Sequence, residues 1–220
     1  MPLFKLIKDN NIKDFEIQLA AVCNINICND YGDSLISTAV KFGRSECLKL
    51  LLAADCDINI YDKYGASLIS IATQFGWFEC LKLLLAAGGD VNKCMNDGTS
   101  PIFHAANNNH IECLKLLLAA GGDINKCRND DTSPISIAAR SGHVKCLKLL
   151  LDAGGDINKC DNDGASPIFW ATANHYPACV KILCEKGANT KSSEYSLSHF
   201  AMEACLIVLK YEGECDTDTE

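Results

Sequence analysis

The chain has 220 residues, of which 48% are hydrophobic and 22% are charged, a composition typical of a folded globular protein and not of a disordered one. Its formal net charge of −8 argues against binding to nucleic acid, which needs a positively charged surface. No apolar run approaches the ~18 residues that mark a membrane span, and charge appears too early at the N-terminus for a signal peptide, so we expect an intracellular, cytoplasmic protein, with the nucleus or an organelle left open.

The first residues predict two short helices. Leu3–Ile7 has the apolar content of one helix, and Ile12–Ala21 that of a second. Asn24–Asn26 follows as a polar exit. The segment 3–28 is therefore one helical pair at the start of the chain.

A strict repeat begins after this segment. Five full units of 33 residues occupy 29–61, 62–94, 95–127, 128–160 and 161–193, and we refer to them as units 1 to 5. A cysteine recurs at the same place in each unit, at Cys47, Cys80, Cys113, Cys146 and Cys179. A fixed period of this length indicates a repeat architecture.

Each unit predicts a turn and two helices. In unit 3 the turn is followed by Ser100, a suitable N-cap, and by Pro101 at the first helical position. A first helix is expected over 102–108, and a second over about 111–120 that ends at Gly121 and Gly122. The second helix has too many apolar residues for a single buried face, so neighbouring units must cover it on two sides.

The repeat breaks down at the C-terminal end of the chain. Residues 194–211 predict a truncated last unit, with terminal helices over Ser198–Lys210. Residues 212–220 are acidic and nearly without apolar side chains, so we expect a frayed end there, with an acidic interaction tail as the alternative.

The period and its residues resemble the ankyrin repeat family. Unit 4 is similar to the family pattern in its Ser133-Pro134-Ile135 opening, its Ala138-Ala139 pair, its Gly142-His143 turn, its aliphatic second helix and its Asp156-Ile157-Asn158 exit. The resemblance implies an all-α ankyrin-repeat solenoid with short β-hairpin-like turns, forming one continuous domain. Residues 3–28 and 194–211 would then be capping repeats, which are atypical because one side faces water.

The cysteines form two rows. The first row, at Cys47 and its equivalents, takes a position where the family buries an aliphatic side chain, so these thiols are expected to act as small hydrophobic groups. The second row is Cys28, Cys94, Cys127 and Cys160. Stacked units are ~8–10 Å apart, farther than the ~7 Å that a disulfide spans between Cα atoms, so neighbouring cysteines should not bridge. Redox sensing or modification remains the alternative.

No pattern predicts catalysis, a metal site or a cofactor. His110 and Cys113 recur as His143 and Cys146, and ligands three residues apart can share a helix face. In this family, however, such a histidine belongs to a turn, and the cysteine points to the core. The chain has no Gly-rich phosphate loop and no His-Glu-x-x-His run. We therefore expect no enzyme and no cofactor.

The resemblance implies that a protein partner binds the concave face, which the turn tips and the first helices form. Units 1 and 2 carry aromatic residues there, and exposed aromatic residues in neighbouring rows would form an apolar patch. The expected partner-binding residues are Tyr31, Lys41, Phe42, Tyr64, Phe75, Asp97 and Arg140. The alternative is that both phenylalanines cover the helix turn and that the tyrosines are ordinary tip residues. Trp77 and Trp170 are further candidates, for which local packing is favoured.

These patterns predict a non-catalytic adaptor or scaffold that binds a protein partner of unknown identity. The chain would bind neither nucleic acid nor a membrane interior, and would act as a monomer or within a larger complex. A permanent structural subunit is the first alternative, and it would bury the convex face as well. An enzyme or small-ligand protein is the second, and it would need a deep pocket with convergent polar groups.

Overall fold

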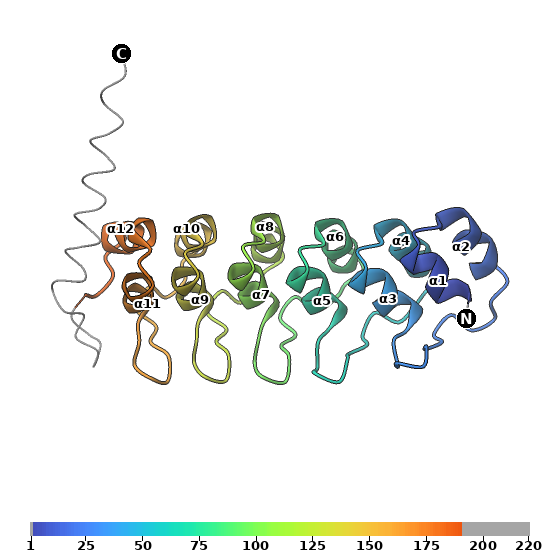
Figure 1. The fold of residues 1–220 in the computed structure, drawn as a ribbon, viewed down its shortest axis with the longest axis horizontal. Helices are drawn as coiled ribbons and strands as arrows, with labels where there is room; N and C mark the ends of the chain where they lie inside the picture. Colours follow the sequence, from blue (N-terminus) through green and yellow to red (C-terminus); the bar gives the residue numbers. More distant parts are fainter. Residues whose placement is uncertain (1, 191–220) are drawn as a thin grey trace, which may run out of the picture.

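The computed structural model describes residues 2–190 and contains twelve α-helices in that range, stacked as successive pairs into an elongated array (Figure 1). Odd-numbered and even-numbered helices form two rows, and long turns project on the side of the odd-numbered row (Figure 1). The helices are α1 (Pro2–Lys8), α2 (Ile12–Leu19), α3 (Leu35–Lys41), α4 (Ser45–Ala53), α5 (Leu68–Gln74), α6 (Phe78–Ala86), α7 (Pro101–Asn107), α8 (Ile111–Ala119), α9 (Pro134–Arg140), α10 (Val144–Asp152), α11 (Pro167–Ala173) and α12 (Pro177–Glu185). The predicted all-α solenoid is confirmed.

The helix bounds agree closely with the sequence pattern. In unit 3, α7 and α8 lie within one residue of the predicted 102–108 and 111–120. At the N-terminal end, α1 starts one residue earlier than predicted, and α2 ends at Leu19 rather than at Ala21. The terminal helices expected over Ser198–Lys210 and the acidic tail 212–220 lie outside the described residues.

A serine starts the first helix of every unit. The Ser100 hydroxyl accepts a hydrogen bond from the Phe103 backbone N–H at 3.1 Å, and Pro101 follows at the start of α7. The same cap forms at Ser34, Ser67, Ser133 and Ser166. This bond satisfies one of the backbone donors that a helix N-terminus leaves unpaired, as the sequence predicted.

The core runs the length of the array as rows of equivalent side chains. The second helices contribute a buried leucine or valine in each unit, and the first helices contribute a buried alanine that lets neighbouring pairs approach. These residues are Leu48, Leu81, Leu114, Leu147 and Val180, and Ala39, Ala72, Ala105, Ala138 and Ala171, each of them inaccessible to solvent. Neighbouring units therefore complete each other's core.

The first cysteine row is part of this core. Its five thiols are at most 2% exposed. Burial raises the pKa of Cys80, Cys113, Cys146 and Cys179 to about 11. All twelve described cysteines are free. The buried thiols stay protonated near neutral pH and act as small apolar groups.

In units 2, 3 and 5, a ring rests on a glycine of the unit before it. Trp77 lies over Gly43, where a Cβ atom would come within 2.6 Å of the indole. The Trp77 Nε1–H also donates to the Lys41 carbonyl at 3.4 Å. His110 and Tyr176 lie over Gly76 and Gly142 in the same way. Trp77 therefore packs locally, as the sequence favoured.

Candidate interaction surface

The turn tips and the first helices form the face on which the sequence placed the partner-binding residues. Each turn is closed by backbone hydrogen bonds, such as that from Met95 N–H to the Thr99 carbonyl at 2.9 Å. The fourth turn residue is a glycine with positive φ in most units, and Asp131 takes that conformation in unit 4 with φ 58°. This turn geometry presents the preceding residue, such as Tyr31 or Tyr64, at the tip.

The tips of units 2 to 5 are joined by a row of asparagines, which we call the tip ladder: Asn96, Asn129 and Asn162. The backbone N–H of Asn129 donates to the Asp97 carbonyl at 3.0 Å, and its side-chain amide donates to the Asn96 carbonyl at 3.2 Å. Asn96 and Asn162 make the equivalent pairs of bonds. Lys63 takes this position in unit 2, and within residues 2–190 it makes no such bond to unit 1.

The predicted aromatic residues are exposed. Tyr31 is 89% exposed, Tyr64 57%, Phe75 50% and Phe42 41%. Lysine ammonium groups lie near two of these rings, with Lys8 Nζ 5.6 Å from the Phe42 centroid and Lys63 Nζ 5.0 Å from the Tyr64 centroid. Packing against the helix turn therefore leaves about half of each phenylalanine accessible.

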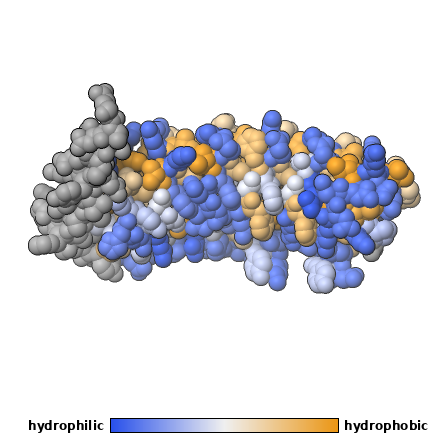
Figure 2. Space-filling model, turned by 45° about the horizontal axis from the view of Figure 1, so that its top comes forward, coloured by the Kyte–Doolittle hydropathy of each residue, from blue (hydrophilic) through white to orange (hydrophobic). Residues whose placement is uncertain are grey.

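Exposed large apolar side chains concentrate in units 1 and 2. Of the eight among residues 2–190, six lie between residues 31 and 77: Tyr31, Phe42, Tyr61, Tyr64, Phe75 and Trp77. On the face that Figure 2 shows, hydrophobic patches alternate with hydrophilic side chains along the array. The aromatic surface is thus local to the N-terminal half.

The predicted charged residues each have a partner in their own part of the array. Lys41 forms an ion pair with Asp33 inside unit 1. Asp97 lies 3.8 Å from Arg128 Nε, and burial, which raises its pKa, is outweighed by the Thr99 hydrogen bonds and the Arg128 charge, so the pKa of Asp97 is lowered. The Arg140 guanidinium lies over the Trp170 ring at 4.4 Å. Asp97 and Arg140 therefore belong to different junctions from the aromatic residues.

Of the side chains described here that fill the junctions between units, the sequence analysis named Trp170 and missed the others. We call the boundary between units 2 and 3 junction 2/3, and the other boundaries likewise. On the unit 3 side of junction 2/3, the His104 Nε2 lies 3.1 Å from the Met95 sulfur. At junction 3/4 the Arg128 guanidinium lies 5.6 Å from the Phe103 centroid. At junction 4/5 the Trp170 Nε1–H donates to Asp161 at 2.8 Å.

A signal for these residues was present in the sequence. His104 and Trp170 lie at equivalent positions, three residues before the first-helix position of Lys41 and Arg140. Residues three apart share a helix face, so this row lies beside the predicted binding positions. Trp170 is half-buried and hydrogen-bonded, which gives it a packing role as well as an accessible edge.

His104 makes the stability of the fold depend on pH. Burial lowers its pKa to about 4, the Asp97 charge raises it, and Arg128 lowers it further. Above its ordinary pKa of about 6.5, histidine is neutral in both the folded and the unfolded chain and contributes nothing. Between pH 6.5 and about pH 4, His104 is protonated in the unfolded chain but stays neutral in the folded chain. Lowering the pH through this range therefore destabilises the fold.

We expect His104→Ile to remove this dependence, because Ile71 and Ile137 occupy the equivalent position in units 2 and 4. Between pH 7.0 and 5.0, wild type should lose about 1–2 kcal/mol more unfolding free energy than the variant. Urea denaturation at both pH values measures this difference. Parallel losses in the two proteins would contradict a lowered pKa at His104.

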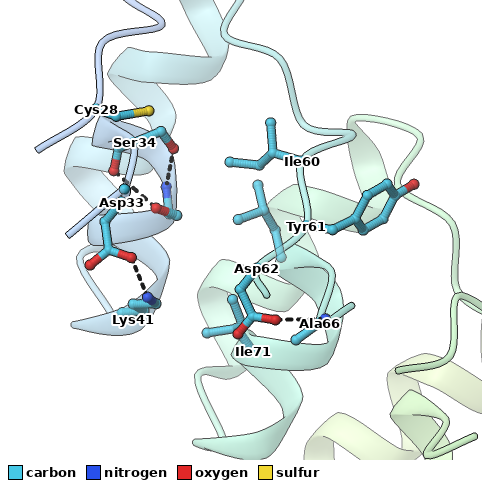
Figure 3. Close-up of a pocket in the computed structure, with 12 residues that line it drawn as sticks. Cys28, Asp33, Ser34, Lys41, Ile60, Tyr61, Asp62, Ala66 and Ile71 are labelled. Atoms are coloured by element: carbon cyan, nitrogen blue, oxygen red, sulfur yellow. Dashed lines mark hydrogen bonds and ion pairs between the residues drawn. The ribbon is translucent and has the colours of Figure 1, made fainter. Parts of the chain in front are cut away.

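A cavity of about 220 Å³ opens between units 1 and 2 (Figure 3). Asp33 and Lys41 lie on one side of it, and Ile60, Tyr61 and Asp62 on the other (Figure 3). The Ser34 and Ser37 hydroxyls at its wall bond within the first turn of α3. The polar groups that line it include the Cys28 thiol, and no histidine is among the lining residues.

Within residues 2–190, no three His, Cys, Asp or Glu side chains come together as metal ligands would. In the same range, no helix has the length and apolar character needed to cross a bilayer.

The chain matches a model of a known protein family. The family model described as ankyrin repeats (3 copies) matches four overlapping stretches of the chain, residues 3–95, 36–130, 68–161 and 102–194. Together these stretches cover residues 3–194, which is most of the chain. A comparison with curated proteins gave no significant match.

Proposed function

The chain belongs to the ankyrin repeat family, whose repeats are generally protein–protein interaction modules, and we propose that it is a non-catalytic adaptor or scaffold that binds a protein partner through its concave face. The observation that carries this proposal is the group of exposed aromatic residues in units 1 and 2, centred on Tyr31, Tyr64 and Phe75. Aromatic side chains that pack against a partner contribute much of the energy of protein interfaces.

The convex side supports a transient adaptor over a permanent structural subunit. The second helices carry exposed ion pairs there, Lys49–Glu46 at 2.6 Å and Lys115–Glu112 at 2.8 Å. A permanent subunit buries large apolar surfaces, and such ion pairs are typical of a solvated face. The proposal includes a cytoplasmic location, where reducing conditions keep thiols free.

We expect the triple variant Tyr31→Ala/Tyr64→Ala/Phe75→Ala to lose its partner. A pull-down from native cell extract with wild type identifies the partner by mass spectrometry, and the purified pair then gives a dissociation constant. Truncating three exposed aromatic side chains at an interface should weaken binding by about a hundredfold or more. Because these side chains are exposed, circular dichroism should show the helical content of wild type.

The matched control is Lys49→Ala/Lys82→Ala/Lys115→Ala, three substitutions on the second helices. It should keep the affinity of wild type. A triple aromatic variant that binds its partner as tightly as wild type would show that the surface used lies elsewhere on the array.

A further inference from the structure

The cavity between units 1 and 2 is open because the tip ladder does not reach unit 1. Lys63 stands where Asn96, Asn129 and Asn162 stand in the later units. A Cβ atom at the unit 3 tip, Gly98, would lie 2.5 Å from the Asn129 side chain, whereas one at the unit 1 tip, Gly32, would meet no atom within 4 Å. The tips of units 1 and 2 are therefore apart, and those of the later units touch.

The side chains that fill the later junctions are also missing at junction 1/2. Asp62 takes the position held by Met95, Arg128 and Asp161, and Ile71 takes the position held by His104 and Trp170. Together, Asp62 and Ile71 have less side-chain volume than Met95 and His104 at junction 2/3 or Asp161 and Trp170 at junction 4/5. The empty space is thus the volume that larger side chains occupy elsewhere in the same array.

The cavity combines apolar walls with one unpaired carboxylate. Asp62 Oδ1 accepts backbone hydrogen bonds from Tyr64 at 2.8 Å and from Ala66 at 2.9 Å. Its Oδ2 has no hydrogen bond and no ion pair within the described residues. The cation at the opposite wall, Lys41, is already paired with Asp33. One negative charge is left without a partner, in a cavity that Ile60 and Ile71 also line.

We propose that this cavity binds the side chain of an arginine from the protein partner, an inference that rests on the proposed function. A guanidinium can donate to the free Asp62 oxygen, and its aliphatic stem can pack on Ile60 and Ile71. The volume of 220 Å³ is below the ~300 Å³ of the smallest drug-sized pockets, so it suits one side chain better than a cofactor. The net charge of −8 favours the approach of a basic segment.

The protein supplies its own precedent at junction 3/4. The Arg128 guanidinium lies there over the Phe103 ring and within 3.8 Å of the Asp97 and Asp130 carboxylates. A guanidinium thus fits between neighbouring units, although Ser37, Tyr31 and Tyr64 hold the places of Phe103, Asp97 and Asp130 at junction 1/2. At junction 1/2 the position of Arg128 is held by Asp62, so the guanidinium has to come from outside.

The test uses n-butylguanidinium as a probe for the arginine side chain, with n-butylammonium and pentanamide as comparisons. Two-dimensional amide NMR on the full chain follows each titration. We expect n-butylguanidinium to shift the amides of Asp33, Tyr61 and Ala66 and to saturate. It should bind about tenfold more tightly than either comparison compound, because only it offers charge and a planar fork together.

Asp62→Asn is the matched variant, because Asn29 holds the equivalent place in unit 1 and accepts the same two bonds, from Tyr31 at 2.9 Å and Asp33 at 3.0 Å. The variant keeps the turn and removes the charge, so it should bind n-butylguanidinium about tenfold more weakly than wild type. Asp163→Asn, at the exposed tip of unit 5, should leave binding unchanged.

Equal binding of n-butylammonium, or unchanged binding to Asp62→Asn, would overturn the proposal. So would shifts confined to units 3 to 5. The probe reports on the cavity without the partner, so its result is separate from the pull-down with the aromatic variant. If the partner binds the triple aromatic variant as tightly as wild type, the proposed function is contradicted. If n-butylguanidinium binds Asp62→Asn as tightly as wild type, this inference is contradicted.

Discussion

Leu114→Ala is expected to lower the free energy of unfolding by about 3 kcal/mol, because it leaves a cavity where a fully buried leucine fills the core. Leu114 lies in α8, at the middle of the array, where units on both sides cover it. Urea denaturation followed by circular dichroism measures the loss.

Lys115→Ala is the control for this change. It alters the next residue of the same helix, whose exposed ammonium pairs with Glu112 at 2.8 Å. An exposed pair of this kind contributes about 0.5 kcal/mol or less, so the control should stay close to wild type. A loss below about 1 kcal/mol for Leu114→Ala would show that α8 is not covered on both sides.

The effect should also reach beyond unit 3. Stability in a repeat array is close to a sum of unit terms and nearest-neighbour interface terms. Leu114→Ala weakens one unit together with the interfaces on either side of it. The unfolding transition should therefore broaden, since the two halves of the array become less strongly coupled.

The sequence was sufficient for the parts of the fold that depend on local chemistry and period. Ser100 and Pro101 predicted the start of α7 because a hydroxyl cap and a missing N–H both suit a helix N-terminus. The apolar content of the second helices predicted coverage on two sides. Burial of the Cys113 row followed from its place in that pattern.

The candidate site could be predicted only in part. The exposure of Tyr31 and Tyr64 followed from their position at turn tips. The cavity did not, because it depends on whether a side chain in one unit reaches the next. Lys63 stands where the later units have asparagine, and the tips of units 1 and 2 are apart there, a difference that no pattern within one unit predicts. Contacts between units depend on the three-dimensional shapes of neighbouring side chains. A comparison of equivalent repeat positions does not show which of these side chains touch.

Gly98→Ala is expected to lower the free energy of unfolding by about 2–3 kcal/mol, and Gly32→Ala by only about 1 kcal/mol. Both glycines have the left-handed conformation, with φ 82° and 81°, so alanine carries the same backbone strain at each. The added Cβ meets nothing near Gly32, but at Gly98 it lies 2.9 Å from the Asn129 backbone nitrogen.

The difference between the two variants measures the closed tip contact. A backbone nitrogen cannot rotate aside, so Gly98→Ala must push the unit 4 tip away and break the bond from Asn129 N–H to the Asp97 carbonyl. Urea denaturation of both variants against wild type gives the difference directly. Equal losses would mean that the tips of units 3 and 4 are as far apart as those of units 1 and 2, which would remove the contrast on which the open cavity depends.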